Sequence, residues 1–199
     1  LIVLALLIVG AAAYAFSTRK ALSPAEPVNE APGAVAAMRY TNFEHDFRFT
    51  YPEGYVLTEA ERGDAHRGHY QVMLVAEENA VPPENGEGPT AITVDVYQND
   101  IDQQPVMNWI TTTNIANFKL GDGKLAERRV GGEAAYTNTW SGLYEGKTTT
   151  FAHGDDIIAV SVTWLTPEDE ILEAYEHVLD SFEFGQFDPP VLNEDATPQ

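Results

Sequence analysis

The chain has 199 residues, with 11 Lys and Arg against 31 Asp and Glu, so its formal net charge is −20 at neutral pH. This size suits one domain with extensions, and a hydrophobic share of 44 % is enough to form a folded core. The negative charge argues against nucleic acid as a partner, because phosphate contacts need clustered Lys and Arg. The lack of cysteine excludes disulfides, thiol catalysis and cysteine-ligated zinc.

The N-terminal segment, residues 1–16, is apolar throughout and carries no charge, and it is followed at once by Ser17-Thr18-Arg19-Lys20. In a helix these residues span about 24 Å, a little short of a hydrocarbon core of about 30 Å. Because the chain starts at Leu1 and not at Met, we expect upstream residues to complete the span. The segment is therefore predicted to be a transmembrane helix that acts as a single-pass anchor.

Two alternatives remain for this segment. It has the pattern of a secretory signal, since Ala13-Tyr14-Ala15 fits a small-x-small cleavage site and Gly10 would break the helix before it. A buried core helix suits the sequence less well, because the segment is apolar on all sides and a Pro-rich stretch follows it. Arg19 and Lys20 alone favour a cytoplasmic C-terminal side. The layout of the chain favours export instead, since an N-terminal apolar segment is followed by a linker and one domain without cysteine. We therefore expect the domain to lie outside the cytoplasm. If the segment is cleaved, we expect the domain to be secreted.

The folded domain is predicted to cover residues 39–184. Residues 17–38 form an Ala- and Pro-rich linker, in which repeated prolines block a continuous helix. The tail at 185–199 is acidic and broken by proline, and we expect it to be disordered.

The first half of the domain alternates apolar and polar residues, which is typical of strands with one buried face. Phe47 to Tyr51 shows this alternation and is stopped by Pro52-Glu53-Gly54, a turn sequence. Strands are predicted at 47–51, from Tyr55, at 69–76 and at 90–98.

A helix is predicted from Pro105 to about Phe118, since proline suits the first turn of a helix. The run Thr111-Thr112-Thr113 is a weak helix former. The apolar residues that fall on half of the helical wheel are Val106, Met107, Ile110, Ile115 and Phe118.

The second half predicts a four-stranded meander and a closing helix. The strands are expected at 124–130, 133–140, 146–153 and 156–164, with turns at the intervening glycines. Thr166-Pro167-Glu168-Asp169 is typical of a helix start, and an apolar stripe follows it. The predicted class is α+β, a largely antiparallel sheet flanked by helices.

These motifs resemble the PsbP-like domains, which have the Mog1/PsbP-type α/β/α sandwich. Phe47-x-Phe49-x-Tyr51-Pro52-x-Gly54-Tyr55 resembles the opening of such domains, and Val130-Gly131-Gly132 through Ala135-Tyr136 resembles a later motif. The resemblance covers about 39–184. It implies an antiparallel sheet between helices and no shared catalytic residues. The photosystem role of the plant members is not carried over to this chain.

Candidate chemistry is sparse. His66 and His69 lie three residues apart and are weak metal candidates, but a solvated loop suits the flanking glycines better. Asp155 and Asp156 are weak calcium candidates in a hairpin turn, where Asp is ordinary. A core position suits Trp109 better than a binding platform, but it falls opposite the predicted apolar stripe, so an exposed Trp109 would mark a contact surface.

The sequence thus favours a membrane-tethered, extracytoplasmic binding or accessory module. We expect no enzyme activity, no cofactor and no nucleic acid, with the membrane and an unidentified protein or small molecule as partners. An anchored hydrolase with a dispersed site and a calcium-binding envelope protein are the alternatives.

Overall fold

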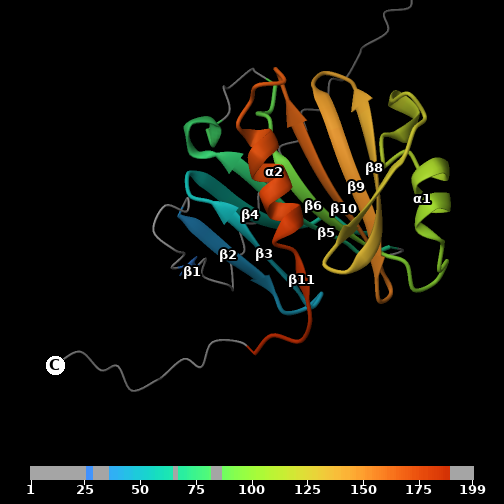
Figure 1. Ribbon diagram of the computed structural model, residues 1–199. Helices are drawn as coiled ribbons and strands as arrows, with labels where there is room; N and C mark the ends of the chain where they lie inside the picture. Colours follow the sequence, from blue (N-terminus) through green and yellow to red (C-terminus); the bar gives the residue numbers. More distant parts are fainter. Residues whose placement is uncertain (1–25, 29–35, 65–66, 82–86, 189–199) are drawn as a thin grey trace, which may run out of the picture.

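The structure, a computed structural model, describes residues 26–28, 36–64, 67–81 and 87–188. The described strands form two antiparallel sheets (Figure 1). The four-stranded sheet has the order β1 (Glu26–Val28), β2 (Ala37–Asn42), β3 (Phe47–Pro52), β11 (Glu183–Phe184). The seven-stranded sheet has the order β4 (Tyr55–Glu61), β5 (His69–Ala76), β6 (Ile92–Gln98), β10 (Asp156–Trp164), β9 (Glu145–His153), β8 (Glu133–Ser141), β7 (Ala126–Val130).

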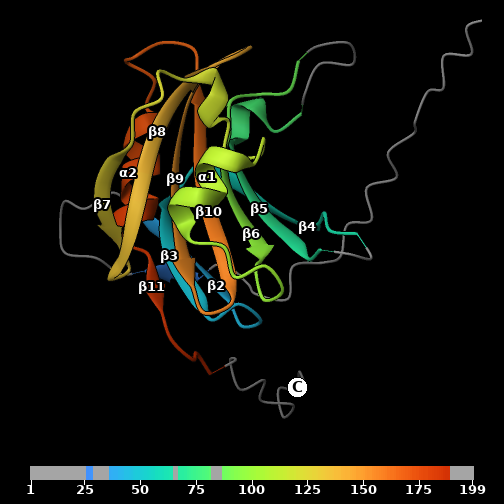
Figure 2. The same cartoon turned by 90° about the vertical axis from the view of Figure 1, so that its right-hand side faces the viewer.

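Two α-helices cover opposite faces of the seven-stranded sheet (Figures 1 and 2). Helix α2 (Ile171–Asp180) and the four-stranded sheet lie side by side on one face, and α1 (Val106–Thr112) lies on the other. Two short 3-10 turns, η1 (Glu77–Asn79) and η2 (Phe118–Leu120), complete the described elements. The predicted α+β class is therefore confirmed as mostly antiparallel sheets with two helices.

The main core lies between the seven-stranded sheet and the layer of α2 and the four-stranded sheet. Aromatic rings pack at its centre: the ring centroids of Phe47, Phe49 and Phe182 lie within 6.2 Å of one another. A smaller core lies under α1. The main core also includes Val72, Leu74, Ile92, Val94, Phe151, Ile158, Val160, Val162, Tyr175 and Val178; the smaller one includes Tyr97, Trp109, Ile110, Ala116, Ile157 and Ala159.

Helix α1 is shorter than predicted and ends at Thr112. The three consecutive threonines lose side-chain freedom in a helix, and the hydroxyl of Thr112 donates back to the Asn108 carbonyl oxygen. Thr113 is already extended, with φ −81° and ψ 162°. The predicted apolar stripe is therefore incomplete, because Met107 is 47 % exposed and Ile115 is 45 % exposed.

Trp109 is buried in the core, so it does not mark the contact surface that an exposed Trp109 would have indicated. Its side chain is 2 % exposed, and its ring lies 5.2 Å from that of Tyr97 on the sheet. In this short helix Trp109 and Ile110 face the sheet together and bury more apolar area than Met107 would.

The closing helix begins later than the Thr166 signal predicts. Residues 166–169 form a turn in which the Asp169 carboxylate accepts hydrogen bonds from the N–H groups of Leu165 and Thr166 and from the Thr166 hydroxyl. These hydrogen bonds lower the pKa of Asp169, and the bond from the Thr166 side chain has the largest effect. Helix α2 then starts at Ile171.

Part of the predicted linker is paired in the four-stranded sheet. Strand β2 starts at Ala37, and Glu26–Val28 pairs with it as β1. The predicted transmembrane helix at 1–16 and the tail from 189 onward lie outside the described residues. Among those described, no helix is both long and apolar enough to span a membrane.

Candidate functional site

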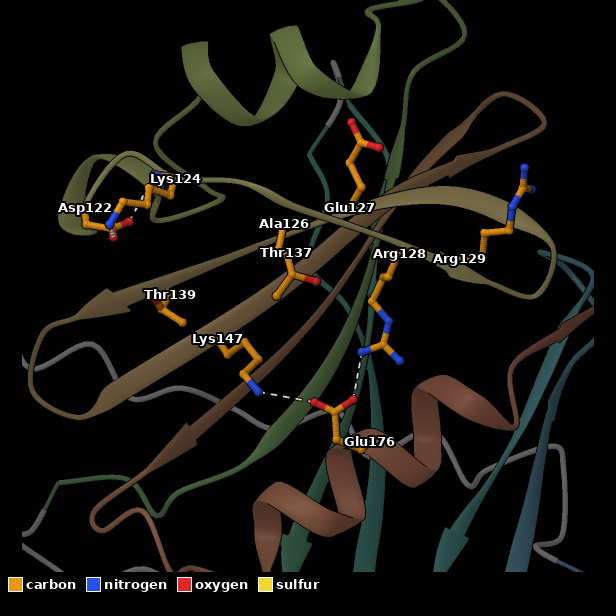
Figure 3. A pocket seen from close by; sticks show the side chains of 10 residues that line it. All are labelled: Asp122, Lys124, Ala126, Glu127, Arg128, Arg129, Thr137, Thr139, Lys147 and Glu176. Atoms are coloured by element: carbon orange, nitrogen blue, oxygen red, sulfur yellow. Dashed lines mark hydrogen bonds and ion pairs between the residues drawn. The ribbon is translucent and has the colours of Figure 1, made fainter.

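An open groove of about 650 Å³ lies beside α2 (Figure 3). It lies between α2 and the edge strand β7, over strands β8 and β9, on the half of the sheet face that β2 and β3 leave uncovered. We call it the β7 groove. Its lining residues are Asp122, Lys124, Ala126, Glu127, Arg128, Arg129, Thr137, Thr139, Lys147 and Glu176.

Strand pairing brings these residues together from distant parts of the sequence. The β7–β8 hairpin closes through Gly131 and Gly132, whose φ angles of 56° and 91° few other residues adopt. The β8–β9 register places Thr139 opposite Lys147. Because side chains alternate between the faces of a strand, Thr137 and Thr139 lie on the same face as Lys147.

One carboxylate holds two cations in this groove. The Arg128 guanidinium donates to Oε2 of Glu176 at 2.7 Å, and the Lys147 ammonium donates to its Oε1 at 3.2 Å. Arg128 also donates to Asp180 at 3.1 Å. Burial raises the pKa of Glu176, but the hydrogen bonds from Arg128 and Lys147 outweigh it, so the pKa lies below its usual range.

Two further cations line the β7 groove. The Lys124 ammonium lies 2.7 Å from Oδ2 of Asp122, and Arg129 donates to the Gly132 carbonyl oxygen at 2.6 Å. The groove thus takes four of the eleven Lys and Arg of the chain. Its lining residues carry four positive and three negative charges, and Asp180, which accepts a hydrogen bond from Arg128, adds a fourth negative charge beside them, in a chain of net charge −20.

Sequence reasoning from the total charge missed this groove, because the sum over the chain conceals a local cluster. A signal was present, since Lys124, Arg128 and Arg129 fall within six residues. Lys147 could be added only once the register of β8 and β9 was known.

His69 lies on the α1 side of the sheet, where it pairs with a buried acid. Its Nε2 is 2.8 Å from Oδ1 of Asp95, which also accepts a hydrogen bond from the Gln71 amide. Its ring stacks on Tyr97 at 4.3 Å. The other weak candidate, His66, lies outside the described residues.

Asp156 lies on the opposite face of the sheet from His69. It contacts His45 of the β2–β3 turn, at 2.9 Å from Nδ1 to Oδ2, whereas its neighbour Ile157 belongs to the core under α1. Asp155 is exposed in the β9–β10 turn. The structure does not bring these candidates together, and the described residues hold no group of three or more His, Asp or Glu that could bind a metal.

A partly buried polar cluster on the covered half of the sheet joins β2 to β4 and β5. The hydroxyls of Tyr40 and Tyr70 both donate to Oε1 of Glu59, and the two hydroxyl oxygens are 2.9 Å apart. Burial is the main cause that raises the pKa of each tyrosine. The cluster connects the two sheets, and we assign it a structural role.

Two comparisons with known proteins give no match: no family model and no curated protein matches the chain. Among solved structures, the chain is similar to the solution structure of cyanobacterial PsbP (CyanoP) from Synechocystis sp. PCC 6803. The identity is 14 %, the TM-score is 0.49, and the match covers 79 % of this chain and 98 % of that one. This similarity assigns no activity to this chain.

Proposed function

We propose that this protein is a binding module without catalytic activity, and that it holds an anionic ligand in the β7 groove. The observation that carries the proposal is the gathering of Lys124, Arg128 and Lys147 along one open groove of a strongly acidic chain, with Arg129 on the outer face of its edge strand. Elsewhere on so acidic a protein an anion is repelled, so this groove is the favoured place for one.

The groove has the chemistry that anion binding needs. Guanidinium and ammonium groups form strong, charge-assisted hydrogen bonds with carboxylates and phosphates. The Thr139 side chain on its floor adds a hydroxyl donor. In the free protein, the Glu176 carboxylate forms ion pairs with Arg128 and Lys147. An incoming anion therefore competes with Glu176 for these two cations.

We further propose that residues 1–16 tether the module to the cell membrane and that the module lies outside the cytoplasm. The support is the apolar composition of this segment. The acidic module is repelled by anionic lipid, so it would stay clear of the membrane surface.

The tether is tested by expressing the full chain and a Leu6→Arg/Ile8→Arg variant and washing the membranes with alkaline carbonate. We expect the unchanged chain to stay in the membrane pellet and the variant to be released, because two arginines make insertion costly. Release of both chains would reject the tether, and protease protection of the module in spheroplasts would reject the export.

The groove is tested by measuring the affinity of the full chain for hexaglutamate by fluorescence anisotropy. We expect the Arg128→Gln/Lys147→Gln variant to bind at least about tenfold more weakly, which corresponds to about 1.4 kcal/mol. The matched control is Arg48→Gln/Arg62→Gln, which removes two positive charges away from the groove. Equal losses in both variants, or no binding by the unchanged chain, would reject the proposal.

A further inference from the structure

Strand β7 forms one wall of the β7 groove and is also an edge of the seven-stranded sheet. Among the described strands it pairs with β8 alone. Ala126, Glu127 and Arg129 on this strand are exposed. An exposed edge strand presents unpaired N–H and C=O groups, which another extended chain can pair with.

The outward-facing backbone groups of β7 can be assigned from its hairpin. In a two-residue turn the flanking residues, here Val130 and Glu133, form a hydrogen-bonded pair. Hydrogen-bonded and non-bonded pairs then alternate along an antiparallel ladder. Arg128 therefore bonds to β8, whereas Glu127 and Arg129 direct their N–H and C=O groups toward the open edge.

The charges along this edge select the kind of strand that can add to it. Arg128 and Arg129 lie on opposite faces of β7, since side chains alternate, and Lys124 precedes the strand. A strand bearing carboxylates would place them about 5 Å from these cations. Two copies of β7 paired around Arg128 would bring the two Arg128 side chains together on one face, although Glu127 would then lie opposite Arg129 on the other face.

We propose that the anionic ligand of the β7 groove is an extended acidic segment of a partner protein, which adds to β7 as a further antiparallel strand. This inference rests on the proposed function and specifies its ligand. Backbone hydrogen bonds to Glu127 and Arg129 supply affinity, and the flanking cations supply selectivity for carboxylates.

Amide hydrogen exchange of the full, 15N-labelled chain tests this proposal. The probe is an eight-residue peptide of alternating Glu and Thr, and inorganic phosphate is the comparison ligand. We expect the peptide to slow exchange of the Glu127 and Arg129 amides by at least about tenfold, and to change the Arg128 amide little because β8 already protects it. Phosphate is expected to leave the Glu127 and Arg129 amides unprotected.

Two variants of one residue separate backbone pairing from charge. Arg129→Gln keeps the N–H and loses the charge, whereas Arg129→Pro loses both. Strand addition predicts that the proline variant binds the peptide at least about fivefold more weakly than the glutamine variant. If Arg129→Pro fails to fold, the exchange experiment decides alone.

The outcomes distinguish the two levels of the proposal. Peptide binding without protection of Glu127 and Arg129 would reject strand addition and leave the anion groove standing. Absence of binding by both peptide and phosphate would reject the proposed function as well.

Discussion

Helix α2 separates two halves of one sheet face that differ in burial and in exposed charge. On one side β2 and β3 cover the sheet, and Phe47 and Phe49 exclude water from between the layers. On the other side no described strand covers β8 and β9, and threonines and cations line an open groove. Burial of aromatic rings makes the covered half the source of stability, whereas exposed charge makes the open half the place for a partner.

The largest expected effect is on the covered half. Phe49 is 1 % exposed, so Phe49→Ala removes a buried ring and leaves a cavity. We expect the free energy of unfolding to fall by about 3–5 kcal/mol. The matched change on the open half is Thr139→Ala, whose exposed side chain should cost no more than about 0.5 kcal/mol. Urea unfolding of the two variants measures both effects, and similar losses would contradict the division between the halves.

A second prediction concerns the packing of Trp140 against Gly146, on the face of β8 and β9 opposite the β7 groove. The Trp140 ring lies directly on Gly146, where an added Cβ would fall 2.3 Å from ring atoms. Gly146→Ala must therefore displace this ring and should lower the free energy of unfolding by about 1–3 kcal/mol. At Gly142 the nearest atom to an added Cβ is 3.7 Å away, so Gly142→Ala should be nearly neutral. Thermal unfolding that ranks the two variants in the reverse order would refute this packing.

Sequence periodicity predicted the strands well, because a half-buried strand leaves a direct trace in the residue pattern. The predicted range 156–164 coincides with β10, and 90–98 contains β6. Strands β1, β2 and β11 were missed: β1 and β11 are too short to show a period, and β2 begins inside the predicted linker. Helix α1 was predicted too long, because tertiary contacts and the threonine run override the apolar wheel.

The candidate site was predicted much less well than the fold. Lys147 is separated from Arg128 by a hairpin and a strand, and only the pairing register places both on Glu176. The net charge of the chain therefore does not show that these residues lie close together in space. The histidine and aspartate candidates were chosen by their proximity in sequence, but side-chain alternation sends His69 and Asp156 to opposite faces.

A smaller effect than at Phe49 or Gly146 is expected at His45, which holds the β2–β3 turn to β10 on the covered half. Burial lowers the pKa of His45, but the hydrogen bond to Asp156 and the charges of Asp156, Glu44 and Glu61 raise it further, so the net shift is upward. Tyr70 faces the same ring at 5.5 Å. A raised pKa adds stability that is fully present below the unfolded value of about 6.5 and is lost as the pH rises through the folded value.

His45→Gln should therefore cost up to about 1 kcal/mol near pH 5.5 and less near pH 8.5. Urea unfolding of both chains at the two pH values measures the difference. Thr139→Ala is the control from the open half, and its effect should not depend on pH. A cost of His45→Gln that grows with pH would contradict the assigned direction.

The affinity of Glu176→Gln for hexaglutamate tests the central claim most directly. Glu176 occupies Arg128 and Lys147 in the free protein, so removing its charge leaves both cations available to a ligand. We predict that the variant binds hexaglutamate roughly threefold to tenfold more tightly than the unchanged chain. A general loss of structure cannot produce such a gain. Unchanged or weaker binding by Glu176→Gln would contradict the assignment of the β7 groove as the ligand site.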